Sequence, residues 1–195
     1  FPYPIKFKYT WRKYQQRVLN SLNEYLKDMH LHVIAPPGSG KTILGLEVAL
    51  RINKPTLILT PTTAIRSQWI QKFCELFLQT AVAPDWISRD IYNPKFITVV
   101  TYQGLHAACN NLKAVDEEPE NEDDFCESEI LNSSNKNLTN IVKSLRKQGI
   151  GVVVVDEAHH LKNEWRQTLN KVKEALDPIV VRLPATPPYH VTPLA

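Results

Sequence analysis

Five short apolar runs constrain the fold of this 195-residue chain more than any other feature of its sequence. None of them alternates apolar with polar residues, and a segment with helical spacing of apolar residues separates each run from the next. Strands of this kind are covered on both faces. They are typical of an α/β fold with a doubly wound, mainly parallel sheet and helices on both faces. The predicted strands are 31–35, 56–60, 96–100, 152–155 and 179–183, and the predicted helices are 14–27, 42–52, 64–78, 138–147 and 165–176.

The loop after the first predicted strand has the composition of a phosphate-binding loop. Residues 35–42 read Ala-Pro-Pro-Gly-Ser-Gly-Lys-Thr, which matches Gly-x-x-x-x-Gly-Lys-Ser/Thr except at its first position. Two glycines let the backbone aim consecutive N–H groups at one point, and the start of the following helix adds positive potential. A glycine- and proline-rich turn that happens to precede Lys-Thr is the alternative. The predicted phosphate contacts are Pro37, Gly38, Ser39, Gly40, Lys41 and Thr42, with Thr42 also predicted to hold Mg²⁺.

A second polar site is predicted where the most apolar strand ends. Residues 152–155 are all valine, and Asp156 and Glu157 follow directly. Because ligands of parallel sheets lie at the carboxyl ends of the strands, we expect both acids beside the phosphate loop. Asp156 can hold Mg²⁺, and Glu157 can polarise water for attack on a γ-phosphate. Two alternatives stay open: a metal site that adds His159 and His160, and a strand that is merely capped by polar residues.

The charge of the chain is distributed unevenly. The net charge is +3, but residues 116–129 hold nine acids and no base, so the remaining residues carry 23 bases and 11 acids. This basic remainder favours a polyanionic partner, although scattered, solvated lysines and arginines are the alternative. The acidic run and the polar residues after it predict a mobile surface insertion at 114–137.

Composition also excludes several classes of protein. The longest apolar run, residues 150–155, is far shorter than the ~20 residues that cross a bilayer, so we predict no membrane partner. The three cysteines show no Cys-x-x-Cys spacing, which argues against a disulfide framework or a zinc ribbon. The first residues contain no apolar secretory segment, and we therefore expect a cytoplasmic protein.

Together these segments resemble the motifs of superfamily 2 helicases and translocases of the DEAH/DExH type, most closely the restriction-subunit-like or DNA-repair-like group. The phosphate loop resembles motif I, and Asp-Glu-Ala-His at 156–159 resembles motif II. Trp-Arg-Lys-Tyr-Gln at 11–15 resembles the segment that reads adenine, which assigns Arg12 and Gln15 to the nucleotide. The other similar segments are 60–69 (motif Ia), 99–105 (a segment that touches nucleic acid) and 185–187 (motif III).

The resemblance implies one RecA-like ATP-binding domain over residues 1–195 that uses ATP and Mg²⁺ and acts on nucleic acid, DNA rather than RNA. It also implies a second RecA-like domain, which we expect to be missing here. Two further function classes stay open: a binding module without turnover, and another P-loop ATPase. Helix capping is the alternative role for Thr62, and Thr101 and Gln103 share the ambiguity. The implied catalytic residues are Lys41, Asp156 and Glu157, the nucleic-acid contacts are Thr60, Thr62, Arg66, Thr101 and Gln103, and the coupling residues are His159 and Thr186.

Overall fold

The computed structural model describes residues 1–33, 40–110 and 127–183. Its centre is a six-stranded sheet in the order β1-β6-β5-β2-β4-β3, in which every pair of neighbours is parallel. The predicted doubly wound α/β fold is thereby confirmed. The strands are β1 (His30–His32), β2 (Thr56–Thr60), β3 (Ile87–Ser88), β4 (Ile97–Thr101), β5 (Val152–Asp156) and β6 (Ile179–Leu183).

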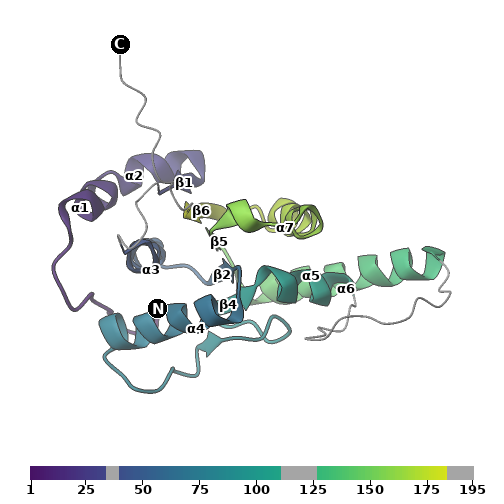
Figure 1. The fold of residues 1–195 in the computed structure, drawn as a ribbon, viewed down its shortest axis with the longest axis horizontal. Helices are drawn as coiled ribbons and strands as arrows, with labels where there is room; N and C mark the ends of the chain where they lie inside the picture. The colour runs from purple at the N-terminus through teal and green to yellow at the C-terminus, as the bar shows by residue number, and fades with distance from the viewer. Residues whose placement is uncertain (34–39, 111–126, 184–195) are drawn as a thin grey trace, which may run out of the picture.

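Helices cover both faces of this sheet, as Figure 1 shows. The α-helices are α1 (Lys13–Asn20), α2 (Leu22–Tyr25), α3 (Lys41–Ile52), α4 (Thr63–Phe73), α5 (Tyr102–Asn110), α6 (Glu127–Gln148) and α7 (Asn163–Leu176). Shorter helical turns are the 3-10 segments η1 (Leu26–Asp28) and η3 (Ala158–His160) and the π-helical segment η2 (Cys74–Leu78).

Two apolar cores lie on the two faces of the sheet. Alternate residues of β5 divide between them: Val152 and Val154 pack with α3 and α4, whereas Val153 and Val155 pack with α5, α6 and α7. Ile58 of β2 belongs to the first core, and its neighbours Leu57 and Leu59 belong to the second. This two-sided burial explains why the central strands read as continuous apolar runs.

Several elements differ from their predicted bounds. The predicted helix 14–27 is interrupted at Ser21 and ends in η1, while α5 and β3 were not predicted. Helix α6 begins at Glu127, eleven residues before the predicted helix 138–147, so it overlaps the second part of the predicted insertion 114–137, whose mobility stays a prediction. Residues 131, 138, 142 and 145 are apolar at helical spacing, which extends the pattern of α6 backward. The rest of the predicted insertion, 114–126, lies outside the described residues.

The order of the strands determines which segments lie near one another at the carboxyl edge of the sheet. Strand β6 alone separates β1, whose end leads to the phosphate loop, from β5, whose end carries Asp156. Two inter-strand spacings of ~4.8 Å place these strand ends about 10 Å apart. No described helix is long and apolar enough to cross a membrane.

Candidate nucleotide-binding site

The first turn of α3 carries the described part of the phosphate loop. Gly40 is its N-cap residue and has φ of +88°, a left-handed conformation that favours glycine. Lys41 and Thr42 follow as half-buried residues of the first turn, which holds no acidic residue. No acidic residue of the first turn therefore offsets the positive potential of this helix start. Pro37, Gly38 and Ser39 lie outside the described residues.

Asp156 occupies the end of β5 as a buried carboxylate, 6% exposed. Burial raises the pKa of its carboxyl above the ordinary value, and the hydrogen bond from Trp69 opposes this rise. The charge of Glu157 raises the pKa further, whereas the charges of Lys41 and Lys72 lower it. Lys41 and Lys72 thus both favour the charged form of Asp156, and the predicted meeting of the two motifs at this edge stays a prediction.

Glu157 leaves the sheet through an unusual backbone conformation. Its φ of +49° lies in the left-handed region, which costs an L-residue roughly 1–2 kcal/mol. Its N–H donates to the carbonyl of Leu183 at 3.1 Å, which pins the turn against the end of β6. Strain of this kind concentrates at functional sites, and here it turns the half-buried Glu157 out of the strand direction.

A cavity of about 340 Å³ adjoins Gly40. Gln15 is 3% exposed on its wall, and its amide accepts from the Arg12 N–H at 3.0 Å and donates to the Gly40 carbonyl at 3.4 Å. Phe7, on the same wall, stacks on Trp11 with ring centroids 4.3 Å apart. The mixture of flat apolar walls and a fixed amide suits a planar base. The lining residues are Phe7, Tyr9, Thr10, Arg12, Gln15, Gly40, Ile43 and Leu76.

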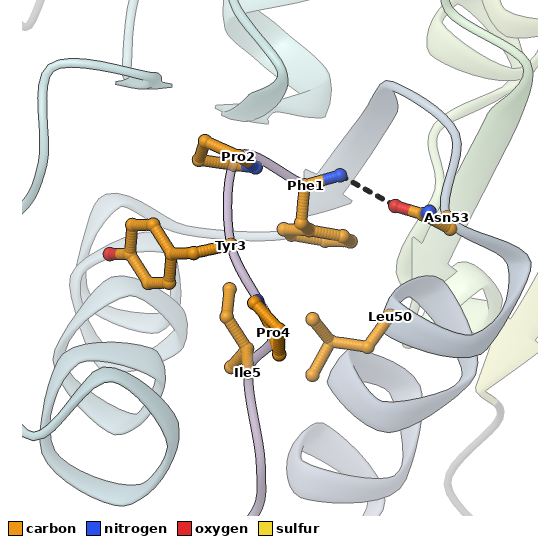
Figure 2. A pocket seen from close by; sticks show the side chains of 7 residues that line it. All are labelled: Phe1, Pro2, Tyr3, Pro4, Ile5, Leu50 and Asn53. Carbon is orange, nitrogen blue, oxygen red and sulfur yellow. Dashed lines mark hydrogen bonds between the residues drawn. The ribbon is translucent and has the colours of Figure 1, made fainter.

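A larger cavity of about 450 Å³ lies elsewhere, between the first residues of the chain and the end of α3 (Figure 2). Its lining includes Phe1, Pro4, Leu50 and Asn53, and the Phe1 amine donates to the Asn53 side chain. Leu50 is nine residues beyond Lys41, so at 1.5 Å per residue this cavity is about 14 Å further along α3. It is therefore separate from the site at the phosphate loop.

The predicted nucleic-acid contacts divide into buried and accessible residues. Thr60 is fully buried, and its hydroxyl lies within 3.4 Å of the carbonyls of Thr62 and Val100, so this structure does not present it to a ligand, and its predicted contact stays a prediction. Thr62 accepts from the Ile65 N–H at 3.2 Å, and Thr101 accepts from the Gly104 N–H at 3.0 Å. The capping alternative is thereby confirmed for both threonines.

Three members of that set remain accessible to a ligand, and one of them is Thr62, which is exposed although it also caps α4. Gln103 is exposed in the first turn of α5, and Arg66 is half-buried on α4, with a buried Nε that has no hydrogen-bond partner among the residues that the structure describes. Thr60 and Thr101 are register partners on neighbouring strands, so the starts of α4 and α5 lie at the same edge of the sheet.

The coupling residues are only partly described. His159 is exposed in η3, after the Asp156–Glu157 pair, and Thr186 lies outside the described residues. The alternative metal site around His159 gains no support, because the described residues contain no group of three or more His, Cys, Asp or Glu that could hold a metal.

Two residues at this site were not assigned to it from the sequence. The indole Nε1 of Trp69 donates to Oδ2 of Asp156 at 2.8 Å, and the Tyr102 hydroxyl donates to the backbone carbonyl of Asp156 at 2.6 Å. Trp69 lies on the apolar side of α4 and is 1% exposed. A buried indole N–H nevertheless needs an acceptor, and that requirement is the signal that could have been used.

The all-parallel sheet with helices on both faces defines an α/β domain of the RecA-like kind. Residues 8–189 match the family described as "Type III restriction enzyme, res subunit". Because that match covers most of the chain, the chain belongs to this family. The predicted recognition of a superfamily 2 N-terminal motor domain is confirmed at the level of family and fold.

Individual relatives agree with this placement. A DNA 3'-5' translocase XPB2 from Sulfurisphaera tokodaii is 30% identical over 115 residues, which are 57% of this chain and 24% of the relative. A putative ATP-dependent RNA helicase QP509L from African swine fever virus is 23% identical over 97% of this chain and 35% of its own length. The crystal structure of the UvsW helicase from bacteriophage T4 superposes with a TM-score of 0.57 at 16% identity, covering 93% of this chain and 56% of that one. The chain thus spans between about a quarter and a third of these two curated relatives.

Proposed function

We propose that this chain is the ATP-binding motor domain of a nucleic-acid helicase or translocase. It hydrolyses ATP when a second RecA-like domain completes the site, and residues 1–195 form the first of the two domains. The observation that carries this proposal is the strand order, in which only β6 separates β1, which precedes α3 and Lys41, from β5, whose end carries Asp156. The charge of Lys41 also lowers the pKa of Asp156. The relatives named as translocases and helicases support it, as does their greater length.

Each side chain at the site has a role that follows from its chemistry. The Lys41 ammonium offsets the charge of the β- and γ-phosphates, and the Glu157 carboxylate accepts a proton from the attacking water. The cavity beside Gln15 holds the adenine base. The hydroxyl of Thr42 and the carboxylate of Asp156 are hard oxygen ligands of the kind that Mg²⁺ prefers. Bound Mg²⁺ supplies a Lewis acid that neutralises developing charge.

The nucleic acid is proposed to lie across the starts of α4 and α5. Both helices offer N–H groups at their N-termini, with Arg66 and Gln103 beside them. Contacts of this kind reach phosphates and carry no base information, so we expect binding with little sequence preference and a strong dependence on salt. DNA is favoured over RNA as the substrate, as the name of the Sulfurisphaera relative suggests.

A second candidate function is a nucleotide- and nucleic-acid-binding module without turnover. It is favoured for this chain by itself, because the chain spans only part of its curated relatives and the hydrolytic site of such motors needs a second domain. The two candidates differ in turnover and agree on nucleotide binding.

The experiment compares this chain with a longer protein that continues past residue 195. ATP binding and hydrolysis are measured with DNA, with RNA and without polynucleotide. We expect Lys41→Ala to abolish nucleotide binding or turnover and Glu157→Gln to retain ATP without hydrolysing it. Lys143→Ala, which removes an exposed lysine of α6, is the matched control. If the longer protein hydrolyses ATP and no polynucleotide ever stimulates it, the motor function is wrong.

A further inference from the structure

We propose that Trp69 and Tyr102 are positioning residues that hold Asp156 from two sides and so present one of its carboxylate oxygens to the metal ion of a bound nucleotide. This inference rests on the proposed function and deepens it. It assigns a task at the nucleotide site to two side chains that lie in the helices proposed to receive nucleic acid.

Trp69 holds the carboxylate itself. It is 1% exposed on α4, and its indole N–H donates to Oδ2 of Asp156, 87 residues away in sequence, at 2.8 Å. The far edge of the same indole packs against α3, because a Cβ added at Gly45 would lie 2.9 Å from Cη2 of Trp69. The ring is thus fixed between the helix of the phosphate loop and the acid at the end of β5. It has no room to change its orientation without moving one of them.

Tyr102 holds the backbone of the same residue. It is 2% exposed at the first position of α5, and its hydroxyl donates to the carbonyl of Asp156 at 2.6 Å. Burial raises the pKa of this phenol, so the hydroxyl stays protonated and remains a donor. Side-chain and main-chain oxygens of Asp156 are therefore held by two helices that pack on opposite faces of the sheet.

Of the two carboxylate oxygens of Asp156, Oδ1 is the one that this inference assigns to the metal ion. Oδ2 is occupied by the indole N–H, and no hydrogen bond to Oδ1 is described from residues 1–33, 40–110 and 127–183. Outer partners that orient a metal-binding carboxylate typically change metal affinity or activity by 10–100-fold when they are removed. Both positioning residues lie close in sequence to the caps of the helices that are proposed to contact nucleic acid. Trp69 lies two turns after the Thr62 cap of α4, and Tyr102 directly follows the Thr101 cap of α5.

The test separates metal binding from folding. Tyr102→Phe removes only the hydroxyl, and benzothienylalanine at position 69 keeps the shape of the ring while it replaces the N–H by sulfur. Trp69→Phe is a genetically simpler third variant. Trp86→Phe, in the same aromatic cluster as Phe73, and Tyr25→Phe, at an exposed tyrosine, are matched controls. Thermal unfolding without nucleotide verifies that each variant folds.

The measurement is the affinity for fluorescent N-methylanthraniloyl-ATP, in excess MgCl₂ and in EDTA, on the whole 195-residue chain. We expect the ratio of the two affinities to fall by about tenfold in the position-69 and Tyr102 variants, with the EDTA value and both controls unchanged. Titration of Mn²⁺ into the nucleotide complex, followed by electron paramagnetic resonance, gives the same comparison without a fluorophore.

The outcomes distinguish this inference from the proposed function. If the unaltered chain shows no gain in affinity from Mg²⁺, the proposed function fails and the inference with it. If the unaltered chain does show that gain and the variants keep it, the positioning role is overturned and the proposed function stands. A parallel loss in MgCl₂ and EDTA also overturns it, because that pattern indicates a general structural role.

Discussion

Replacing Gly45 by alanine tests the packing that links α3 to Asp156. A Cβ at this position would lie 2.8 Å from Cδ1 of Leu183 and 2.9 Å from Cη2 of Trp69. Favourable contacts between carbon atoms begin near 3.5 Å, so neighbours would have to move by about 0.6–0.7 Å. Leu183 is fully buried and Trp69 is 1% exposed, so neither side chain can swing toward solvent.

The net effect is the difference between two opposing terms. Overpacking of a well-filled core costs about 1–3 kcal/mol. Alanine is roughly 1 kcal/mol better than glycine in a helix interior, which offsets part of that cost. We therefore expect Gly45→Ala to destabilise the chain by about 1 kcal/mol, or about 2–4 °C in Tm for a domain of this size.

The assay is thermal and urea unfolding of Gly45→Ala beside Gly104→Ala. Gly104 also lies in a helix, and the only contact recorded for its added Cβ is 3.1 Å to Oγ1 of Thr101. Oγ1 of Thr101 would have to move by a few tenths of an ångström, less than Leu183 and Trp69 at Gly45, so Gly104→Ala should cost less stability than Gly45→Ala. The reasoning is refuted if Gly45→Ala is as stable as the unaltered chain, because Trp69 would then have room that this packing denies it.

Three further predictions concern the site and its caps. Glu157→Gly should be about 1 kcal/mol more stable than Glu157→Ala in chemical denaturation, because both lack the carboxylate and only glycine accepts φ of +49° without strain; equal stability would contradict the strained backbone. Asp156→Asn should raise Tm at neutral pH. Burial raises the folded-state pKa of Asp156, so its charged form costs stability above that pKa, and the cost is lost as pH falls through it. The gain should therefore shrink from pH 8 toward pH 4, and a gain that grows toward acid pH would reverse the sign of this argument. Thr62→Ala should cost about 1 kcal/mol in urea unfolding through loss of the α4 cap, whereas Thr62→Ser should cost much less.

The sheet was largely predictable because its signals are local. Strands buried on both faces must be apolar at every position, and the predicted bounds of β2 and β6 match those of the structure. Strand β3 pairs through only two residues, which is too short for any pattern. Helix α5 was not predicted, although Tyr102, Leu105 and Cys109 follow helical spacing.

The position of the candidate site in the fold was predictable where a sequence motif lies directly after a predicted strand or before a predicted helix. The helix that follows the predicted phosphate loop and the strand that ends in Asp156 were both predicted from residue types alone, and the roles of these residues stay predictions. The side-chain contacts around Asp156 and Thr60 depend on tertiary structure and could not be predicted in this way. The choice of Asp156 as the acceptor for Trp69 depends on how α4 packs across β5, and the burial of Thr60 depends on its neighbour β4. Residue types could not separate Thr60, which is enclosed, from Gln103, which is exposed.

The most direct test of the central claim is a crystal structure of the chain grown with Mn²⁺ and a non-hydrolysable ATP analogue. Manganese is located by its anomalous scattering. Our account predicts a manganese peak beside the Asp156 carboxylate and the Thr42 hydroxyl, with the terminal phosphate beside Lys41. A nucleotide bound at another edge of the sheet, or a manganese ion held away from Asp156, would contradict it.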